Sequence, residues 1–369
     1  MPGTDIPPFP ASSPTVVRVA LPVPLPRLFD YLPAGEPPAV VGARVRVPFG
    51  TRERIGVVAA IGTPPADVPE LRRIIRTLDP APLLGGELLG SLSWLARYTH
   101  APLGEVLATA LPASLRRGED LPETGTWGWQ LSEAGATARA SLRSGTRPRA
   151  LADQLAAGAC GEEMLGELVI GWRTAARALA GRGLVERVRL TDAAAGRAPA
   201  AGPLANAEQA AAIAAIADSR DHFAPLLLDG ITGSGKTEVY LQAIADCLAR
   251  GRQALVLVPE IGLTPQMLAR FRARLGVTVH ALHSDLNDNE RARVWTAAWR
   301  GEARVIVGTR SAVFTPLPDA GLIVIDEEHD GSYKQQDGVR YHARDFALVR
   351  SETATGRYEV LERWPLERG

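Results

Sequence analysis

The segment Leu226-Leu227-Leu228-Asp229-Gly230-Ile231-Thr232-Gly233-Ser234-Gly235-Lys236-Thr237 joins an apolar run to a helix-forming stretch. Its spacing, G-x-x-x-x-G-K-T, is that of a phosphate-binding P-loop. Glycine lets the backbone curl so that its N–H groups point at phosphate oxygens, and the positive end of the following helix faces the same phosphates. A glycine-rich turn without a ligand is the structural alternative. The complete motif between a strand and a helix favours a nucleotide site.

The loop residues have separable predicted roles. Lys236 can reach the β- and γ-phosphates, and the Thr237 hydroxyl can hold Mg²⁺. We therefore predict ATP and Mg as ligands. The residues of this loop that we expect to bind them are Gly230, Thr232, Gly233, Ser234, Gly235, Lys236 and Thr237.

A second signal lies at Leu322-Ile323-Val324-Ile325-Asp326-Glu327-Glu328-His329, where an apolar strand ends in carboxylates. Asp326 would orient Mg²⁺, and Glu327 would polarise the attacking water. This D-E-x-H form is the one that helicases use, although an acidic turn after a strand is the structural alternative. We predict Lys236, Asp326 and Glu327 as the catalytic residues.

Composition limits the class of protein. The chain has 369 residues with 41 basic and 41 acidic side chains, so net charge does not announce a nucleic-acid partner. Its two cysteines form no CxxC pair, which argues against a disulfide framework or a cysteine zinc site. No apolar run approaches the ~20 residues of a membrane span, and the start of the chain is not a signal peptide. We expect a cytoplasmic protein without a membrane partner.

The chain is expected to be multidomain α/β, with a small β-rich N-terminal domain, a winged-helix-like α+β domain and a doubly wound parallel sheet. A plain helical linker domain is the alternative for the middle part. In the first domain we predict strands at 16–21, 42–50 and 54–61 and a helix at 86–98. In the middle domain we predict a strand at 127–131, helices at 151–157, 162–168 and 173–180, and a strand ribbon at 181–188. The predicted boundaries are a disordered lead-in at 1–13, the β-rich domain at 14–117, the middle domain at 118–195, a linker at 196–203, the ATP-binding domain at 204–350 and a tail at 351–369.

Strands and helices alternate in the third domain. The predicted strands are 226–228, 254–258, 277–282, 305–308 and 322–325, and the main helices between them are 238–250, 264–275 and 287–300. Because ligands of such sheets sit at the carboxyl ends of the strands, the P-loop and Asp326 should meet at one edge.

Three further stretches resemble superfamily-two helicase motifs. Gln209 precedes the P-loop where a glutamine would read adenine, although an ordinary glutamine at a helix start fits the residue alone. The loops 258–266 and 308–312 follow strands and would contact the phosphates of a single strand, with Thr309, Arg310 and Ser311 as the contact residues.

These motifs together closely resemble the PriA family (primosomal protein N′), the primosomal replication-restart DNA helicases of superfamily two. The likeness covers about Val16 to Arg350. It is carried by Asp229–Tyr240, Val258–Gln266, His283–Asn287, Asp326–Gln336, Tyr341–Asp345, Leu21–Leu32 and Arg44–Gly50.

The resemblance implies a 3′ to 5′ motor that recognises stalled or collapsed replication forks and starts primosome assembly. In this family the N-terminal domain holds the 3′ end of the nascent leading strand. By motif match, Phe29, Asp30, Gly50 and Arg72 would line that pocket, with simple core packing as the alternative for Phe29. An aromatic ring can stack on a base, and a carboxylate can accept from the 3′ hydroxyl.

The family also implies a coupling loop and partners. The segment Ser332–Arg344 matches the aromatic-rich loop that couples DNA contact to ATP hydrolysis, with a flexible polar loop as the alternative; its contact residues would be Tyr333, Lys334, Arg340 and Tyr341. Expected partners are forked or single-stranded DNA, single-strand binding protein and other primosome proteins, in the bacterial cytoplasm at the nucleoid.

After Arg350 the sequence departs from the family. No Gly-Ser-Ala-Thr-Pro motif, second motor lobe, arginine finger or cysteine-rich zinc region follows, although zinc is expected for the family. We expect an internal deletion and a truncation. The alternative function is therefore a fork- and nucleotide-binding fragment that does not turn over ATP. An unrelated P-loop ATPase such as a kinase is more remote. We expect the isolated chain to bind forks, to bind Mg-ATP weakly and not to unwind duplexes.

Overall fold

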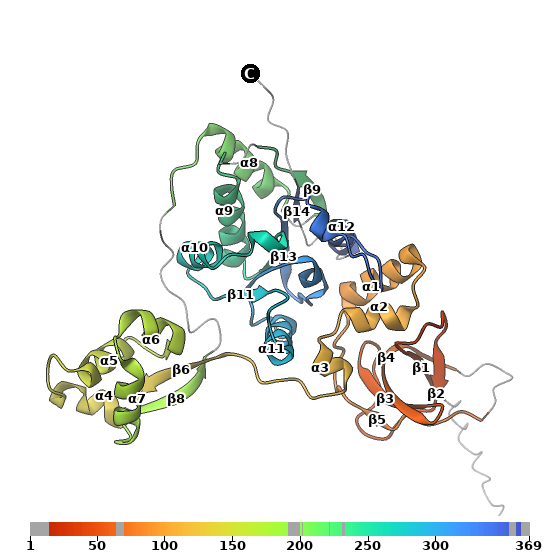
Figure 1. The fold of residues 1–369 in the computed structure, drawn as a ribbon, viewed down its shortest axis with the longest axis horizontal. Helices are drawn as coiled ribbons and strands as arrows, with labels where there is room; N and C mark the ends of the chain where they lie inside the picture. Colours follow the sequence, from red (N-terminus) through yellow and green to blue (C-terminus); the bar gives the residue numbers. More distant parts are fainter. Residues whose placement is uncertain are drawn as a thin grey trace, which may run out of the picture. The chain divides into compact units, whose positions relative to one another are not determined.

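The structure is a computed structural model that describes residues 15–63, 70–190, 200, 202–220, 222–230, 233–353 and 359–362. The chain divides into two compact units, residues 1–120 with 336–341, and residues 121–335 with 342–369. Figure 1 labels most of the helices and strands of both. The predicted lead-in at 1–13 and most of the predicted linker at 196–203 lie outside the described ranges.

The first unit holds a five-stranded antiparallel sheet with the order β2-β1-β4-β3-β5. Its strands are β1 (Val16–Ala20), β2 (Phe29–Tyr31), β3 (Arg44–Phe49), β4 (Arg52–Gly62) and β5 (Arg76–Thr77). Alternate valines of β1 and β3 point into one core, as the period of a strand requires. The predicted strands 16–21, 42–50 and 54–61 are confirmed. The strands β2 and β5 were not predicted, because two or three residues carry no readable alternation.

Three helices complete this unit: α1 (Gly86–Thr99), α2 (Leu103–Thr109) and α3 (Ala113–Arg116). The predicted helix 86–98 is confirmed as α1, which buries Leu88, Leu92 and Leu95 at helical spacing. In α2, a Cβ on Gly104 would lie 1.7 Å from the carbonyl oxygen of Leu21. Glycine therefore allows α2 to approach the end of β1 this closely.

A buried arginine connects the strands of this unit to its last helix. Arg44 is 1% exposed, and its Nε and Nη2 donate to the two oxygens of Asp79 at 2.9 and 2.8 Å. Its Nη1 donates to the carbonyl oxygens of Leu115 and Glu119 at 2.7 and 2.9 Å. A buried charge is stable only when it is paired and hydrogen-bonded in this way.

The middle part of the chain has its own sheet and core. Its antiparallel sheet has the order β7-β6-β8, from β6 (Thr126–Leu131), β7 (Cys160–Gly161) and β8 (Val185–Leu190). Its helices are α4 (Glu133–Ala138), the 3-10 helix η1 (Arg139–Ser141), α5 (Arg147–Leu155), α6 (Glu162–Leu168) and α7 (Trp172–Ala180). The predicted strand 127–131 and the predicted helices 151–157, 162–168 and 173–180 are present. The sheet argues against a plain helical domain, and the winged-helix assignment stays a prediction.

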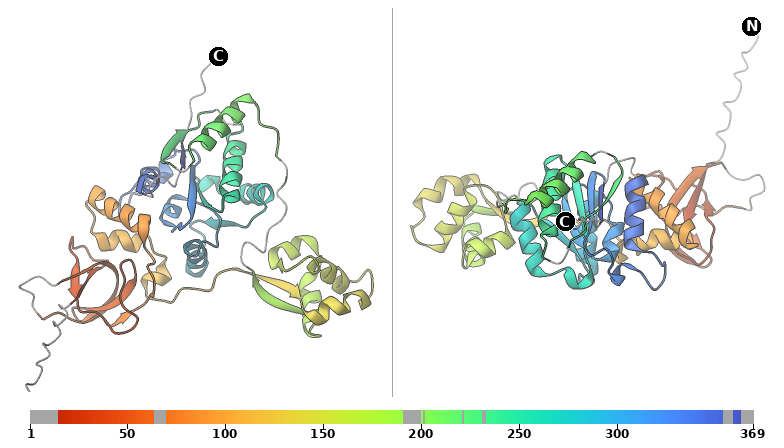
Figure 2. Two further views of the ribbon diagram at one scale, coloured as in Figure 1. Left: turned by 180° about the vertical axis from the view of Figure 1, so that it is seen from behind. Right: turned by 90° about the horizontal axis from the view of Figure 1, so that it is seen from above.

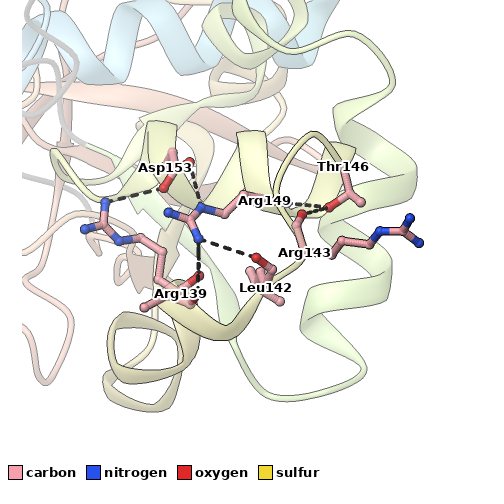
Figure 3. A network of polar contacts seen from close by, with 7 residues as sticks. Arg139, Leu142, Arg143, Thr146, Arg149 and Asp153 are labelled. Atoms are coloured by element: carbon pink, nitrogen blue, oxygen red, sulfur yellow. Dashed lines mark hydrogen bonds and ion pairs between the residues drawn. The ribbon is translucent and has the colours of Figure 1, made fainter.

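One arginine network holds the turn before α5 in place. Arg149 donates to Asp153 at 2.8 Å and to the carbonyl oxygens of Arg139 and Leu142 at 3.1 and 3.4 Å, as Figure 3 shows. Thr146 caps α5 by accepting from the backbone N–H of Arg149. The helix therefore begins where a threonine stands before a proline-containing first turn.

The third part is a six-stranded sheet of parallel strands in the order β11-β12-β10-β13-β14-β9. The strands are β9 (Ala224–Leu227), β10 (Gln253–Leu257), β11 (Val279–Leu282), β12 (Val305–Gly308), β13 (Ala320–Ile325) and β14 (Glu359–Glu362). All five predicted strands are present. The apolar run at 226–228 lies mostly in the edge strand β9, in which alternate residues are exposed.

Helices cover both faces of this sheet. On one face lie α8 (Ala207–Asp218), α9 (Lys236–Ala249) and α10 (Pro265–Leu275), which share a core with β10, β12 and β13. On the other lies α12 (Ala343–Thr353), which packs on β13 and on η4 (Arg310–Phe314) (Figure 2). The predicted helix 287–300 is α11 (Asp288–Trp299), with Asn287 and Glu290 forming a capping box. The doubly wound sheet predicted from the sequence is confirmed.

Strand β14 was not predicted. It pairs with β13 on one side and β9 on the other, and so it fills the position between the P-loop strand and the acidic strand. It comes from the stretch that the sequence marked only as a tail. No helix in the described part of the chain is long and apolar enough to cross a membrane.

The network of Arg44 predicts a stability difference between two ion pairs of the same unit. Asp79→Ala leaves a buried guanidinium without its carboxylate and should cost about 3–5 kcal/mol of unfolding free energy. Glu53→Ala removes the exposed partner of Arg46, 54% exposed, and should cost about 0–1 kcal/mol. Chemical denaturation of the two variants measures both. Equal losses would contradict the role assigned to Arg44.

Candidate nucleotide and DNA site

The P-loop connects the edge strand β9 to the helix α9. Gly233 and Gly235 have φ values of 85° and 87°, a region that side chains other than glycine rarely adopt. The first helical residue is Lys236, whose Nζ donates to the carbonyl oxygen of Gly230 across the loop. The lysine therefore folds back over the loop where phosphates would lie. Thr232 lies outside the described residues.

Gln209 supports the loop from α8. Its side-chain oxygen accepts from the N–H of Asn206 at 3.0 Å and completes a capping box, and its Nε2 donates to the carbonyl oxygen of Ser234 at 3.1 Å. A Cβ on Gly235 would lie 2.3 Å from that Nε2. The helix-start role that fits Gln209 by itself is therefore present, together with a contact to the P-loop that the sequence did not predict.

The acidic residues follow β13 at the carboxyl edge of the sheet. The backbone N–H of Asp326 donates to Leu257 of the neighbouring strand β10 at 2.9 Å, which continues the ladder to the end of the strand. Glu327 has a φ of 49° and is exposed, with its carboxylate 3.6 Å from His329. A non-glycine residue in this region of φ is uncommon and often marks a functional turn.

Tyr240 links the two motifs. Its hydroxyl lies 3.1 Å from Thr237 Oγ1 and 3.3 Å from Asp326 Oδ2. Burial raises the pKa of the Asp326 carboxyl above its usual range, and Glu327 adds to the rise, whereas the Tyr240 hydroxyl and Lys236 favour the ionised form. The P-loop helix and the acidic strand end therefore form one site.

The first residues of the predicted coupling loop contact this site. Tyr333 is completely buried, and its hydroxyl donates to the backbone carbonyl oxygen of Asp326 at 2.6 Å. Arg310 Nη1 donates to the carbonyl oxygens of Ser332 and Lys334, on either side of Tyr333, at 2.8 and 3.1 Å. The expectation that Tyr333 is a strand-contact residue does not fit its burial. It supports Asp326 instead.

The other predicted strand contacts differ in exposure. Ser311, Lys334 and Arg340 are exposed, whereas Thr309 and Tyr341 are buried. Lys334 forms a β-bridge with His342, so the loop between them is closed at its base. Exposed cations and a hydroxyl are the groups that contact a nucleic-acid backbone.

Three of the four residues predicted for the 3′-end pocket are linked. The ring of Phe29 packs edge-to-face against Phe49, with centroids 5.2 Å apart. Arg72 Nη1 donates at 2.9 Å to the carbonyl oxygen of Gly50, the residue after Phe49. Phe29 is half-buried and Arg72 is exposed, so both could still meet a ligand.

Asp30 lies on the other side of β2. Successive side chains of a strand point to opposite faces, so its carboxylate leaves the strand away from the ring of Phe29. It lies 3.7 Å from Arg18, its partner in register on β1. The fourth predicted pocket residue, Asp30, therefore follows Phe29 in sequence but already has a cation beside it.

Two supports of the site were missed. Tyr240 stands within a predicted helix, and nothing in its spacing distinguishes it from a core residue. Glu238 is 3% exposed, and on α10 Arg274 donates both to its carboxylate and to the carbonyl oxygen of Ala200. A pair separated by 36 positions leaves no local sequence signal. Among the described residues, no cluster of three histidine, cysteine or carboxylate side chains could hold a metal ion.

Comparisons with known proteins match two regions. Residues 18–112 match the family model of a 3′ DNA-binding domain, and residues 206–359 match that of the DEAD/DEAH box helicases. The chain is 43% identical over 346 residues to the replication restart protein PriA of Haemophilus influenzae, covering 90% of this chain and 47% of the relative. It is 33% identical over 341 residues to the PriA of Treponema pallidum, covering 90% and 41%.

Bacillus subtilis PriA is 52% identical over 135 residues, which cover 37% of this chain and 17% of that protein. The solved UvsW helicase of bacteriophage T4 has a TM-score of 0.31 at 15% identity, over 45% of this chain and 55% of that one. The chain spans about half the length of the long matches among the curated relatives.

The contacts of Gln209 generate a prediction that separates adenine reading from loop support. Gln209→Glu keeps an acceptor for the capping box but loses the donor to Ser234, so the melting temperature should stay near that of the parent while nucleotide affinity falls. If Gln209 only supports the loop, ATP and GTP affinities should fall equally. A loss confined to ATP, measured by equilibrium binding, would show that it reads the adenine edge. Unchanged affinity for both ATP and GTP would contradict loop support and adenine reading alike.

Proposed function

The chain belongs to the PriA family of replication restart proteins, and we propose that it acts in an ATP-dependent DNA motor at stalled or collapsed replication forks. There it would start the assembly of the primosome. Fork recognition, 3′ to 5′ movement, and contacts with single-strand binding protein and other primosome proteins are part of this proposal. The activity of the whole protein is proposed as well, since the matches cover about half of the relatives.

The observation that carries the proposal is the joining of two motifs through one hydroxyl. Tyr240 contacts Thr237 of the P-loop helix and Asp326 of the acidic strand, so a phosphate chain on Lys236 would lie beside the carboxylates. Phosphoryl transfer needs mainly positioning and neutralisation of charge, and these side chains supply both.

The donor set fits Mg²⁺. Thr237 supplies a hydroxyl and Asp326 a carboxylate, which are hard oxygen ligands that this cation prefers. Bound there, the ion would neutralise charge on the β- and γ-phosphates. The Tyr240 contact supports this assignment, because it holds the two oxygen donors close together.

The protein's own residues would act in sequence as nucleotide enters. Lys236 exchanges the carbonyl oxygen of Gly230 for phosphate oxygens, and the backbone N–H groups of the loop meet the same phosphates. Glu327 is exposed beside the site and positions the attacking water. No zinc chemistry enters this scheme.

Contacts of the coupling loop support a link between DNA and ATP turnover. Arg310 holds the backbone on both sides of Tyr333, and Tyr333 holds the backbone of Asp326. A strand phosphate that drew Arg310 away would free this turn and shift the carboxylate. We therefore propose that Arg310 senses the strand, with Ser311, Lys334 and Arg340 as additional contacts and Thr309 and Tyr341 as supports.

The alternative is a fork- and nucleotide-binding fragment that does not turn over ATP. Hydrolysis needs positive charge beside the transferring phosphoryl group, and an arginine finger, where one acts, supplies about 10³–10⁵ in turnover. ATP hydrolysis by the 369-residue chain, measured with and without single-stranded DNA, distinguishes the two readings. Stimulated turnover supports the motor, and binding without turnover supports the fragment. No binding of either ligand would contradict both.

The N-terminal domain generates a prediction about DNA ends. A fork with a 3′ hydroxyl should bind more tightly than the same fork with a 3′ phosphate, because the Asp30 carboxylate, on the Arg18 face of β2, would accept from a hydroxyl and repel a phosphate. Asp30→Ala should reduce this difference, and Arg18→Gln should enlarge it by removing the cation beside Asp30. Fluorescence anisotropy at one fixed salt concentration measures the affinity of the parent and of both variants for each fork. Equal affinity of the parent chain for both forks would contradict a pocket that recognises the 3′ hydroxyl.

A further inference from the structure

We propose that Tyr240 is a positioning residue that orients the hydroxyl of Thr237 toward the metal ion. The proposal rests on the proposed nucleotide-binding function and adds a residue to it. Tyr240 ends the stretch Asp229–Tyr240 that carries the family resemblance, but the sequence predicts no role for it.

The position of the Tyr240 hydroxyl is fixed by packing. The side chain is 5% exposed, and its ring lies against Phe271 of α10 with centroids 6.2 Å apart. It stands three residues after Thr237 on α9, so the two side chains lie on one face of the helix. The hydroxyl therefore stays 3.1 Å from Thr237 Oγ1 and 3.3 Å from Asp326 Oδ2.

The number of protons determines the direction of the two hydrogen bonds. Each hydroxyl has one proton, and an ionised carboxylate can only accept. A tyrosine phenol keeps its proton at neutral pH, whereas the Asp326 carboxylate must be ionised to bind a metal ion. Tyr240 must then donate to Asp326, and its oxygen is left to accept the proton of Thr237.

This direction matters to the metal. A threonine binds Mg²⁺ through an oxygen lone pair, so its proton must point away from the ion. When the Tyr240 oxygen accepts this hydrogen bond, the Thr237 proton points toward Tyr240. The lone pairs of the Thr237 oxygen are then free to face the metal ion. The same contact holds the Asp326 carboxylate beside Thr237. Without the phenol, both groups would have to reorganise when the metal binds.

The experiment is equilibrium binding of a fluorescent ATP analogue to the 369-residue chain, in Mg²⁺ and in excess EDTA. The readout is the ratio of the two affinities. Tyr240→Phe keeps the ring and removes the oxygen. It should reduce the enhancement by Mg²⁺ about tenfold, as expected for a lost hydrogen bond to a charged group, and leave affinity in EDTA near that of the parent.

Thr237→Ala should abolish the enhancement, and adding Tyr240→Phe to it should cause no further change, since Tyr240 acts through Thr237. Tyr31→Phe is the matched control, because its buried hydroxyl bonds to Pro48 in the other unit. Site-specific 3-fluorotyrosine at position 240 keeps an O–H group and should keep the enhancement. This variant tests the proposal even if Tyr240→Phe fails to fold.

Each remaining outcome has a distinct meaning. A parent chain that binds no nucleotide overturns the proposed function itself. A parent enhanced by Mg²⁺ with a Tyr240→Phe variant enhanced equally overturns the role of Tyr240 alone. Equal losses in Mg²⁺ and in EDTA would show that Tyr240 only packs the helix, and additive effects with Thr237→Ala would show that it acts elsewhere.

Discussion

The parallel direction of six strands is the constraint on which the site depends. Because the carboxyl ends of all these strands lie at one edge of the sheet, the P-loop after β9 and the carboxylates after β13 share that edge. Tyr240 of the P-loop helix therefore contacts Asp326, although 86 positions separate the two residues in the chain. The two strands are not neighbours, since β14 lies between them. The P-loop and the acidic residues are therefore joined by a side chain of α9 and not by strand pairing. That side chain is Tyr240, which contacts both Thr237 and Asp326.

Buried polar side chains fix the turns that lie near the carboxyl edge of the sheet. Arg350 is completely buried on α12 and donates to the carbonyl oxygens of Val313 and Thr315 at 2.7 and 2.9 Å. It thereby fixes the segment that begins with Arg310. Tyr333 adds a hydrogen bond to the backbone carbonyl oxygen of Asp326. Each of these groups would be costly to bury without its partner, so the turns that carry the site have little freedom to adopt other conformations.

The sequence predicted those features that local pattern encodes. Asn287 and Glu290 mark the start of α11 by a capping box, and the spacing from Gly230 to Thr237 marks the P-loop. It could not predict β14, whose four residues acquire a strand conformation only by pairing with β13 and β9. The sequence also placed Tyr333 among the residues that contact single-stranded DNA, because an aromatic residue in a polar loop carries no sign of its burial. Pairs distant in the chain, such as Glu238 with Arg274, exist only in the folded state.

The central claim is that the P-loop and the end of β13 form one nucleotide site. A crystal structure of the chain with Mg²⁺ and a non-hydrolysable ATP analogue tests it most directly. We expect Lys236 to have left the carbonyl oxygen of Gly230 for a phosphate oxygen, with the metal ion between Thr237 and Asp326. A nucleotide bound elsewhere, or one bound at the loop while Lys236 keeps its contact with Gly230 and no metal lies near Asp326, would contradict the claim.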